Sequence, residues 1–161
     1  MDRLYTPWRY AFINAEKPGV CVFCAKLTMP DREAFVVHRG QNAFVCLNTF
    51  PYNNGHVMVI PNLHVASLAE LPPPAAHEVM DLTQRCESVL RHVYRPDGLN
   101  LGVNLGKAAG AGVADHVHIH VLPRWSGDGN FMTVVGETRV LPEELTTTWE
   151  RLRAGFAEIS A

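Results

Sequence analysis

The most constraining feature of this sequence is the run HVHIHVLP at positions 116–123, in which histidine alternates with an aliphatic residue. Side chains of a β-strand point alternately to opposite faces, so His116, His118 and His120 are predicted to share one face of a strand. The aliphatic residues between them then face a hydrophobic core. Three imidazoles on one face are costly to bury without partners, so this face is expected to hold a ligand or a catalytic site.

The rest of the chain shows strand and helix patterns that together indicate a fold class. Short β-branched runs predict strands at 34–40, 42–48, 56–61 and 99–106, with 131–136 as a candidate for another. The two-residue link Gly40-Gln41 indicates a hairpin with a primed turn. Three prolines at 72–74, followed by apolar residues at helical spacing, predict a long helix that ends near Arg95.

A final helix is expected over roughly 142–159, after the strands. Strands, one long helix, more strands and a last helix predict an α+β protein. Its sheet is expected to be mostly antiparallel, with about five strands and the long helix lying across it.

Composition narrows the class of protein further. The chain has 161 residues, of which 47% are hydrophobic and 19% charged, as expected for one globular domain. A formal net charge of −2 argues against a broad nucleic-acid surface, so no nucleic-acid partner is expected. No apolar run approaches the roughly 20 residues that span a bilayer, and the first residues are charged and aromatic where a signal peptide is apolar. We therefore expect a cytoplasmic protein without a membrane partner.

The histidine face has two chemical uses. On a flat strand, three alternate residues span about 13 Å, so at most two of these histidines reach one metal ion. Alternatively, one imidazole nitrogen attacks phosphorus and leaves again, while the flanking histidines donate hydrogen bonds to phosphoryl oxygens. Lys107, Arg124 and the glycine-rich loop 107–112 are suited to hold anionic oxygens.

These residues resemble the histidine triad family of nucleotide hydrolases and transferases. The resemblance rests on HVHIHVLPR and on CLNTFPYNNGHVMVIP at 46–61, and it covers about 34–125. Three further stretches, LYTPWR, LNLGVNLG and PRWSGDGNFMTVVG, are similar to bacterial diadenosine tetraphosphate phosphorylases and hydrolases. The resemblance implies one histidine triad domain over 1–161, with an N-terminal arm at 1–33, a core at 34–125 and a C-terminal extension at 126–161. It also implies a homodimer in which two sheets pair edge to edge.

The resemblance assigns roles to individual residues. It makes His118 the nucleophile, places His120 on the scissile phosphate and its bridging oxygen, and puts His56 beside them in support. Many relatives carry a glutamine at the position of Gly112, and its absence leaves space in which free phosphate could bind. The implied nucleotide-binding positions are Asn48, Asn104, Gly110, Ala111, Gly112 and His120. Trp125, a large residue just past the triad, is a further candidate by its position, with core packing as the alternative.

The implied activity is cleavage of dinucleoside polyphosphates, with diadenosine tetraphosphate as the expected small-molecule substrate. A nucleotidyl-histidine intermediate would pass to phosphate or to water, and phosphorolysis is slightly favoured over hydrolysis. Two alternatives stay open. One is a phosphoramidase that releases AMP from an amine, and the other is a nucleotide-binding regulatory module with little turnover. Stacking of Trp125 on a second base would favour dinucleotides.

The motif Cys21-Val-Phe-Cys24 is compatible with reduced thiols, a redox couple or half of a zinc site. No thioredoxin-like pattern surrounds it, so zinc is favoured. In zinc-containing members of the resembled family, this motif is joined by a histidine after the GHVxxxP strand and by the first triad histidine. These correspond to His64 and His116, which gives structural zinc as the expected cofactor, although phosphorylase-like relatives need not keep the site. The remaining cysteines, 46 and 86, are expected to be buried and inert.

Overall fold

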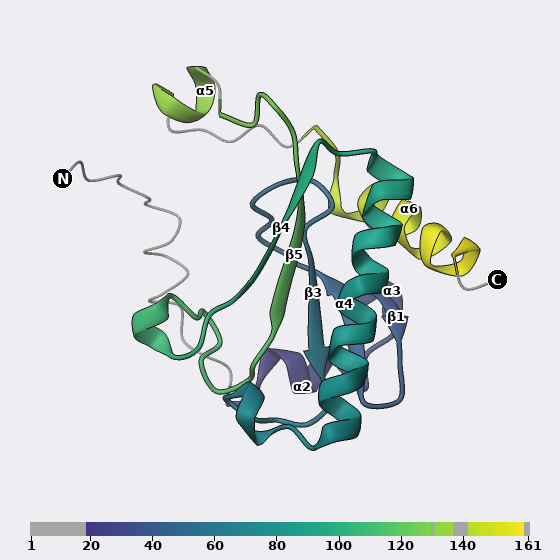
Figure 1. Ribbon diagram of the computed structural model, residues 1–161, viewed down its shortest axis with the longest axis vertical. Helices are drawn as coiled ribbons and strands as arrows, with labels where there is room; N and C mark the ends of the chain where they lie inside the picture. Colours follow the sequence, from purple (N-terminus) through teal and green to yellow (C-terminus); the bar gives the residue numbers. More distant parts are fainter. Residues whose placement is uncertain (1–18, 130, 137–141, 160–161) are drawn as a thin grey trace.

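One antiparallel sheet forms the centre of the computed structural model, which describes residues 19–129, 131–136 and 142–159 (Figure 1). The strands lie in the order β1-β2-β3-β5-β4. Their bounds are β1 Val36–Arg39, β2 Ala43–Leu47, β3 Val57–Pro61, β4 Gly98–Val103 and β5 Ile119–Arg124. This arrangement confirms the predicted α+β class and the expected number of strands.

The long helix α4 (Pro73–Tyr94) lies across one face of the sheet (Figure 1). Prolines occupy its first turn, where the N–H groups have no partner within the helix, as the sequence predicted. The C-terminal helix α6 (Leu145–Glu158) packs beside α4 and on β1. The shorter helices are α2 Val22–Lys26, α3 Asp31–Ala34, α5 Phe131–Val134 and the 3-10 turns η1 Leu68–Glu70 and η2 Lys107–Ala109.

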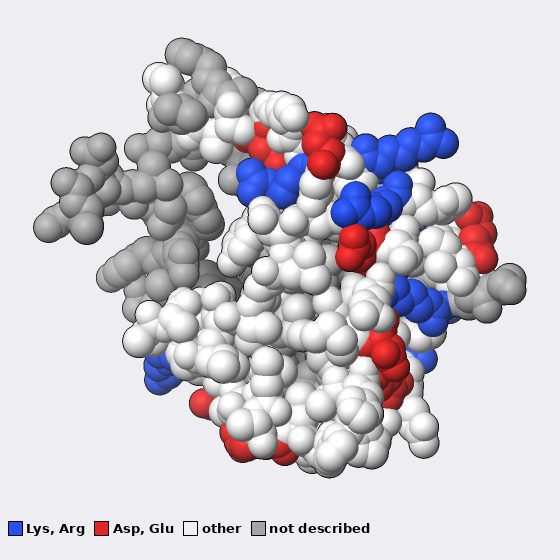
Figure 2. All heavy atoms as spheres, in the orientation of Figure 1, with Lys and Arg blue, Asp and Glu red and all other residues white. Residues whose placement is uncertain are grey.

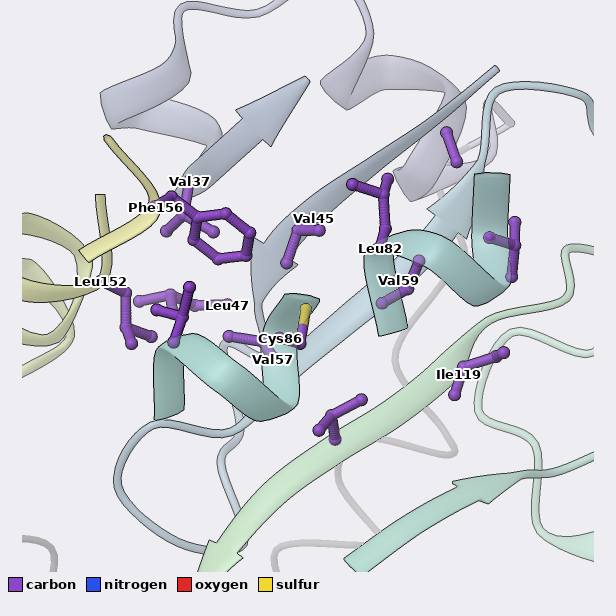
Figure 3. Packing of buried hydrophobic residues seen from close by; sticks show 14 of the residues in the cluster. Val37, Val45, Leu47, Val57, Val59, Leu82, Cys86, Ile119, Leu152 and Phe156 are labelled. Atoms are coloured by element: carbon purple, nitrogen blue, oxygen red, sulfur yellow. The ribbon is translucent and has the colours of Figure 1, made fainter. Parts of the chain in front are cut away.

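The main hydrophobic core lies between the sheet and the two helices α4 and α6 (Figure 3). Alternate residues of β2, β3 and β5 face this side and are almost fully buried, whereas the residues between them face the other side. The side chains that meet here from the sheet and helices include Val45, Leu47, Val57, Val59, Leu82, Cys86, Ile119, Leu152 and Phe156.

A smaller cluster of buried side chains covers the opposite face of the sheet, on which the histidines also lie. Its buried members are Phe23, Ala34, Val36, Phe44, Cys46, Met58 and Ile60. The two cysteines without a partner motif, Cys46 and Cys86, are fully buried, and burial raises the pKa of each thiol, to about 12 for Cys46. The prediction that both are core residues is confirmed.

Two expectations about the chain change with the structure. Residues 131–136 do not form a strand, because the segment lies away from the sheet, and its residues Phe131–Val134 make the short helix α5 instead (Figure 1). Residues 1–18 of the predicted N-terminal arm lie outside the described residues. Within the described ranges, no helix is both long and apolar enough to cross a membrane.

Candidate functional site

The three histidines of the alternating run take two different places at the start of β5. His116 and His118 precede the strand rather than belonging to it, because the N–H of Val117 donates to the carbonyl of Val65 at 2.7 Å instead of joining the ladder. His118 is 4% exposed, and its ring lies 4.8 Å from that of His120 in an edge-to-face arrangement. His116 is fully buried and turns toward the cysteine pair.

A chain of hydrogen bonds defines the proton positions on His56 and His120. Nδ1 of His56 accepts from the backbone N–H of Tyr52 at 3.1 Å and lies 3.4 Å from the amide nitrogen of Asn48. The neutral ring therefore carries its proton on Nε2, which donates to Nδ1 of His120 at 2.9 Å. His120 in turn must carry its proton on Nε2, so it offers an N–H donor.

His118 is held in the opposite tautomer. Its Nδ1 lies 2.9 Å from the carbonyl oxygen of His116, which can only accept, so the proton sits on Nδ1. Nε2 of His118 is left with its lone pair. Burial lowers the pKa of His118, and burial followed by the nearby His118 lowers that of His120 to about 4, so both rings are neutral at neutral pH. Adjacent imidazoles thus offer a nucleophilic lone pair and a hydrogen-bond donor.

The neutral state of His56 makes stability depend on pH. Burial, then the neighbouring His120, lowers the folded-state pKa of His56 to about 3 from an ordinary 6.5. Between these values the unfolded chain binds more protons, so His56 should cost stability as pH falls, by up to about 1.4 kcal/mol per pH unit. The thermal midpoint of His56→Asn should consequently fall less between neutral pH and pH 5 than that of wild type. An equally steep fall in His56→Asn would contradict this, and His77→Asn at an exposed position is the control.

The polar residues predicted to bind nucleotide lie at different distances from the histidines. Asn48 contacts His56 directly, and its side-chain oxygen accepts from the N–H of Phe50 at 3.0 Å. Val103, the last residue of β4, pairs with Ile119, the first residue of β5, so Asn104 and His118 each lie one residue beyond this pair. Asn48 therefore lies next to His56, and Asn104 directly follows the strand that pairs with β5.

The glycine-rich loop and Trp125 make contacts within the protein. The N–H groups of Ala109, Gly110 and Ala111 donate to carbonyl oxygens inside the loop. In this conformation these three N–H groups are therefore engaged and do not point at a bound phosphate. Of the loop positions predicted to bind nucleotide, Gly112 is the one whose N–H makes no such bond. Trp125 follows β5 and lies about 16 Å along the strand direction from His120. It packs edge-on against Tyr94 and lines a cavity of about 560 Å³ near α6.

The four residues predicted to hold zinc meet in one cluster. Their ligand atoms all lie within 4.8 Å of one another. Nδ1 of His116 is 3.4 Å from Sγ of Cys21 and 3.7 Å from Sγ of Cys24, and Nδ1 of His64 is 3.2 Å from Sγ of Cys24. The first triad histidine therefore joins the cysteine cluster and not the pair formed by His118 and His120.

The geometry of this cluster fits a tetrahedral zinc ion. Zinc bonds of about 2.3 Å to sulfur and about 2.0 Å to nitrogen at a tetrahedral angle imply sulfur-to-nitrogen separations of about 3.5 Å, and the contacts of 3.2, 3.4 and 3.7 Å lie close to this value. Nε2–H of His116 donates to the carbonyl of Pro61 at 2.9 Å, so Nδ1 is the deprotonated atom that faces the thiols. Two thiols and two imidazoles are also the donors that zinc prefers.

Two residues near the histidines were missed by the sequence reasoning. Phe23 is 3% exposed and contacts both His116 and His118. The sequence could not show this contact, because an apolar residue between two cysteines indicates only ordinary core packing. The ring of Tyr52 lies 4.7 Å from that of His56, and its backbone orients the same imidazole. An aromatic residue in turn-forming sequence was the available clue for Tyr52.

Comparison with known proteins agrees with this fold and site. A family model described as the HIT domain matches residues 30–127. The chain is 37% identical to a protein of Mycobacterium tuberculosis named AP-4-A phosphorylase, over 98% of this chain and 85% of that protein. With a match of this extent, the chain belongs to the HIT domain family, as the sequence motifs indicated.

Solved structures of similar proteins support the same assignment. A zinc-bound histidine triad family protein from Mycobacterium smegmatis is 31% identical, with a TM-score of 0.71, and the match covers 87% of this chain and 95% of that chain. A hypothetical histidine triad nucleotide-binding protein from Sulfolobus tokodaii is 24% identical, with a TM-score of 0.69, covering 87% and 94%. The second likeness concerns the fold alone.

Proposed function

We propose that this chain cleaves dinucleoside polyphosphates, with diadenosine tetraphosphate as the substrate, through a nucleotidyl intermediate on His118. The observation that carries the proposal is the opposite tautomers of His118 and His120. Similarity to a relative named AP-4-A phosphorylase supports the substrate class. In this proposal the whole chain, 1–161, acts as one histidine triad domain, with its core at 34–125.

The first chemical step uses both tautomers. The Nε2 lone pair of His118 attacks the phosphorus next to one nucleoside, and the bond from that phosphorus to the bridging oxygen breaks. The bridging oxygen leaves with the bonding electrons toward Nε2–H of His120, which stabilises the developing charge. His118 becomes cationic, and its Nδ1–H bond to the carbonyl of His116 strengthens because the donor is now charged. His56 keeps His120 in the donating tautomer throughout.

The remaining predicted residues bind the two ends of the substrate. Asn48 would contact the ribose of the transferred nucleotide, and Asn104 would hold phosphoryl oxygens beside His118. The backbone N–H of Gly112 would also bind phosphoryl oxygens, and those of Gly110 and Ala111 would join it after a rearrangement of the loop. Trp125 would stack on the distal base at the other end of β5.

The second step transfers the nucleotidyl group to an acceptor. We propose that inorganic phosphate attacks the phosphorus, the phosphorus–nitrogen bond breaks, and His118 regains its neutral form. Lys107 and the space left by Gly112 would accommodate the phosphate. Cleavage of diadenosine tetraphosphate by this route produces ATP and then ADP.

A phosphate titration tests the activity and the acceptor together. At fixed diadenosine tetraphosphate, the rate should rise with phosphate and saturate, and chromatography should show ADP and ATP in equal amounts. If the products are AMP and ATP and the rate does not depend on phosphate, the reaction is hydrolysis and not phosphorolysis. No cleavage, together with release of AMP from an adenosine phosphoramidate, would favour the phosphoramidase alternative. The Lys107→Ala variant should raise the phosphate concentration needed for half-saturation.

We also propose that Cys21, Cys24, His64 and His116 bind one structural zinc ion. The fit of the donor atoms and the zinc-bound relative from Mycobacterium smegmatis support this. Bound zinc would cross-link the segment before α2 to the segment before β5. Thiolate ligands persist in a reducing compartment, which is consistent with a cytoplasmic location.

A homodimer is proposed through the edge strand β4. β1 at the other edge is covered by α6, whereas β4 presents a row of exposed residues that includes Leu101 at 51%. A broad region without Lys, Arg, Asp or Glu lies over β4 and β5 in Figure 2. An uncharged edge strand of this kind readily pairs with another strand, here the same strand of a second copy.

Replacing Leu101 by glutamate should convert the dimer into a monomer. Two like charges would face each other near the symmetry axis and oppose strand pairing. Sedimentation measurements should give twice the chain mass for wild type and the single-chain mass for Leu101→Glu. Met80→Glu is the control, because Met80 is equally exposed at 52% but lies on α4. Equal masses for Leu101→Glu and wild type would contradict the proposed interface.

A further inference from the structure

Phe23 lies between the metal cluster and the histidine proposed as nucleophile. It is the third residue of the Cys21–Cys24 motif, within α2, and is 3% exposed. Its ring is edge-on to His116, with centroids 5.4 Å apart and planes at 82°, and tilted against His118, at 4.9 Å and 57°. One aromatic ring therefore contacts a proposed metal ligand and the proposed nucleophile at once.

His116 makes a second connection between the two sites. Its Nδ1 faces the thiols, its Nε2–H donates to Pro61, and its carbonyl oxygen accepts from Nδ1–H of His118. The backbone that fixes the tautomer of His118 therefore belongs to a residue whose side chain is held by the cluster. Any relaxation of the cluster reaches His118 through the carbonyl of His116 and through the ring of Phe23.

We propose that Phe23 is a positioning residue that couples metal occupancy at the cysteine–histidine cluster to the orientation of His118. This inference rests on the function and the zinc site proposed above. The ring of His118 is bounded by Phe23 on one side and by His120 at 4.8 Å on another, so Phe23 limits its rotation. Bound metal fixes the spacing of Cys21 and Cys24 and hence the backbone that carries Phe23.

Loss of the metal leaves two thiols and two imidazoles with only weak mutual contacts. Helix α2, which carries Phe23, can then shift, and the ring of His118 gains freedom away from the attacking orientation. A displacement of this kind lowers the rate of the chemical step far more than it weakens substrate binding. Metal removal and loss of the Phe23 ring should consequently have the same effect, and combining them should add little.

The test compares Phe23→Leu with Phe44→Leu. Phe44 belongs to the same buried cluster and is 1% exposed, so both variants remove the same side-chain volume from one cluster. Phe44 carries no part of the proposed site. Each protein is prepared with zinc and after chelation, and four quantities are measured: metal content, thermal midpoint, kcat and KM for diadenosine tetraphosphate, and the nitrogen chemical shifts of the His118 ring.

Zinc-loaded Phe23→Leu should retain one metal ion and show kcat lowered about tenfold with KM within twofold. Chelation should lower kcat of wild type and Phe44→Leu by a similar factor, but that of Phe23→Leu by less than twofold. The His118 nitrogen shifts should change on chelation in all three proteins, because the carbonyl of His116 still transmits part of the relaxation, but the change should be clearly smaller in Phe23→Leu than in wild type and Phe44→Leu. The thermal midpoints of the two variants should be similar.

The inference is overturned if chelation and Phe23→Leu lower kcat additively, or if Phe23→Leu behaves as Phe44→Leu does. It is also overturned if wild type binds no metal. Absence of diadenosine tetraphosphate turnover would contradict the proposed function alone, because the nitrogen shifts report the coupling without substrate. In that case, a chelation-induced shift that depends on Phe23 supports the coupling, and a shift indifferent to Phe23 refutes it.

Discussion

His118→Ala should lower the turnover of diadenosine tetraphosphate by about ten-thousandfold or more, because it removes the atom that forms the covalent intermediate. His118 is buried but lies at the edge of the smaller cluster, so the variant should still fold. Its far-ultraviolet circular dichroism and its affinity for a bound nucleotide, measured by calorimetry, should stay close to those of wild type. Turnover is followed by separating the nucleotide products.

Two further variants test whether the loss of turnover is specific to the imidazole of His118. His92→Ala removes an exposed histidine and should keep wild-type turnover. His118→Gly leaves a space that free imidazole can enter, so added imidazole should restore part of the activity to this variant and not to His120→Asn. If His118→Ala retained more than a tenth of the wild-type kcat, the nucleophile would have to be another residue.

Purified protein should contain one zinc ion per chain, and its removal should lower the thermal midpoint by about 10 °C. Binding at about a thousandfold above the dissociation constant stabilises the folded chain by about 4 kcal/mol, which corresponds to a shift of this size in a chain of this length. Elemental analysis and thermal unfolding with and without a chelator measure both quantities.

His64 and His77 provide a matched pair for the zinc experiment, because both are exposed histidines. His64→Ala should lose most of the zinc and its response to chelator, whereas His77→Ala should keep both. Zinc-free protein with no response to chelator would remove the metal proposal. His116 would then stand as a hydrogen-bonding member of the triad, through its carbonyl and its contact with Pro61.

The sequence predicted best those helices and strands whose formation depends on the periodicity of neighbouring residues. Alternation of polar and aliphatic residues predicted a strand at 116–123, but β5 begins only at Ile119, so of the three histidines only His120 lies in it. Helical spacing after three prolines placed α4 to within a residue at each end. These patterns succeed because side-chain direction follows backbone periodicity. The segment 131–136 has a strand-like composition, but among the described residues no strand pairs with it, so composition alone gave the wrong element there.

The hairpin between β1 and β2 shows how a distant residue changes a local prediction. A hairpin is present, but its link is Gly40-Gln41-Asn42, and Gly40 lacks the positive φ of the predicted primed turn. The carboxylate of Glu78 accepts from the backbone N–H groups of Gln41 and Asn42, each at 2.6 Å. Glu78 lies on α4, so no rule that considers only the turn residues could include it.

The sequence by itself determined the family, the order of strands and helices, and the residue types of the histidine and cysteine motifs. Only the tertiary structure decided which histidine joins which group and where each proton lies. His116 turns to the thiols because a contact between Val117 and Val65 draws the chain out of the ladder before β5. The tautomer of His118 follows from the carbonyl of His116, two residues before it, whereas that of His120 follows from His56, which lies far away in the sequence. In each case the proton of the imidazole goes to the nitrogen that faces an acceptor.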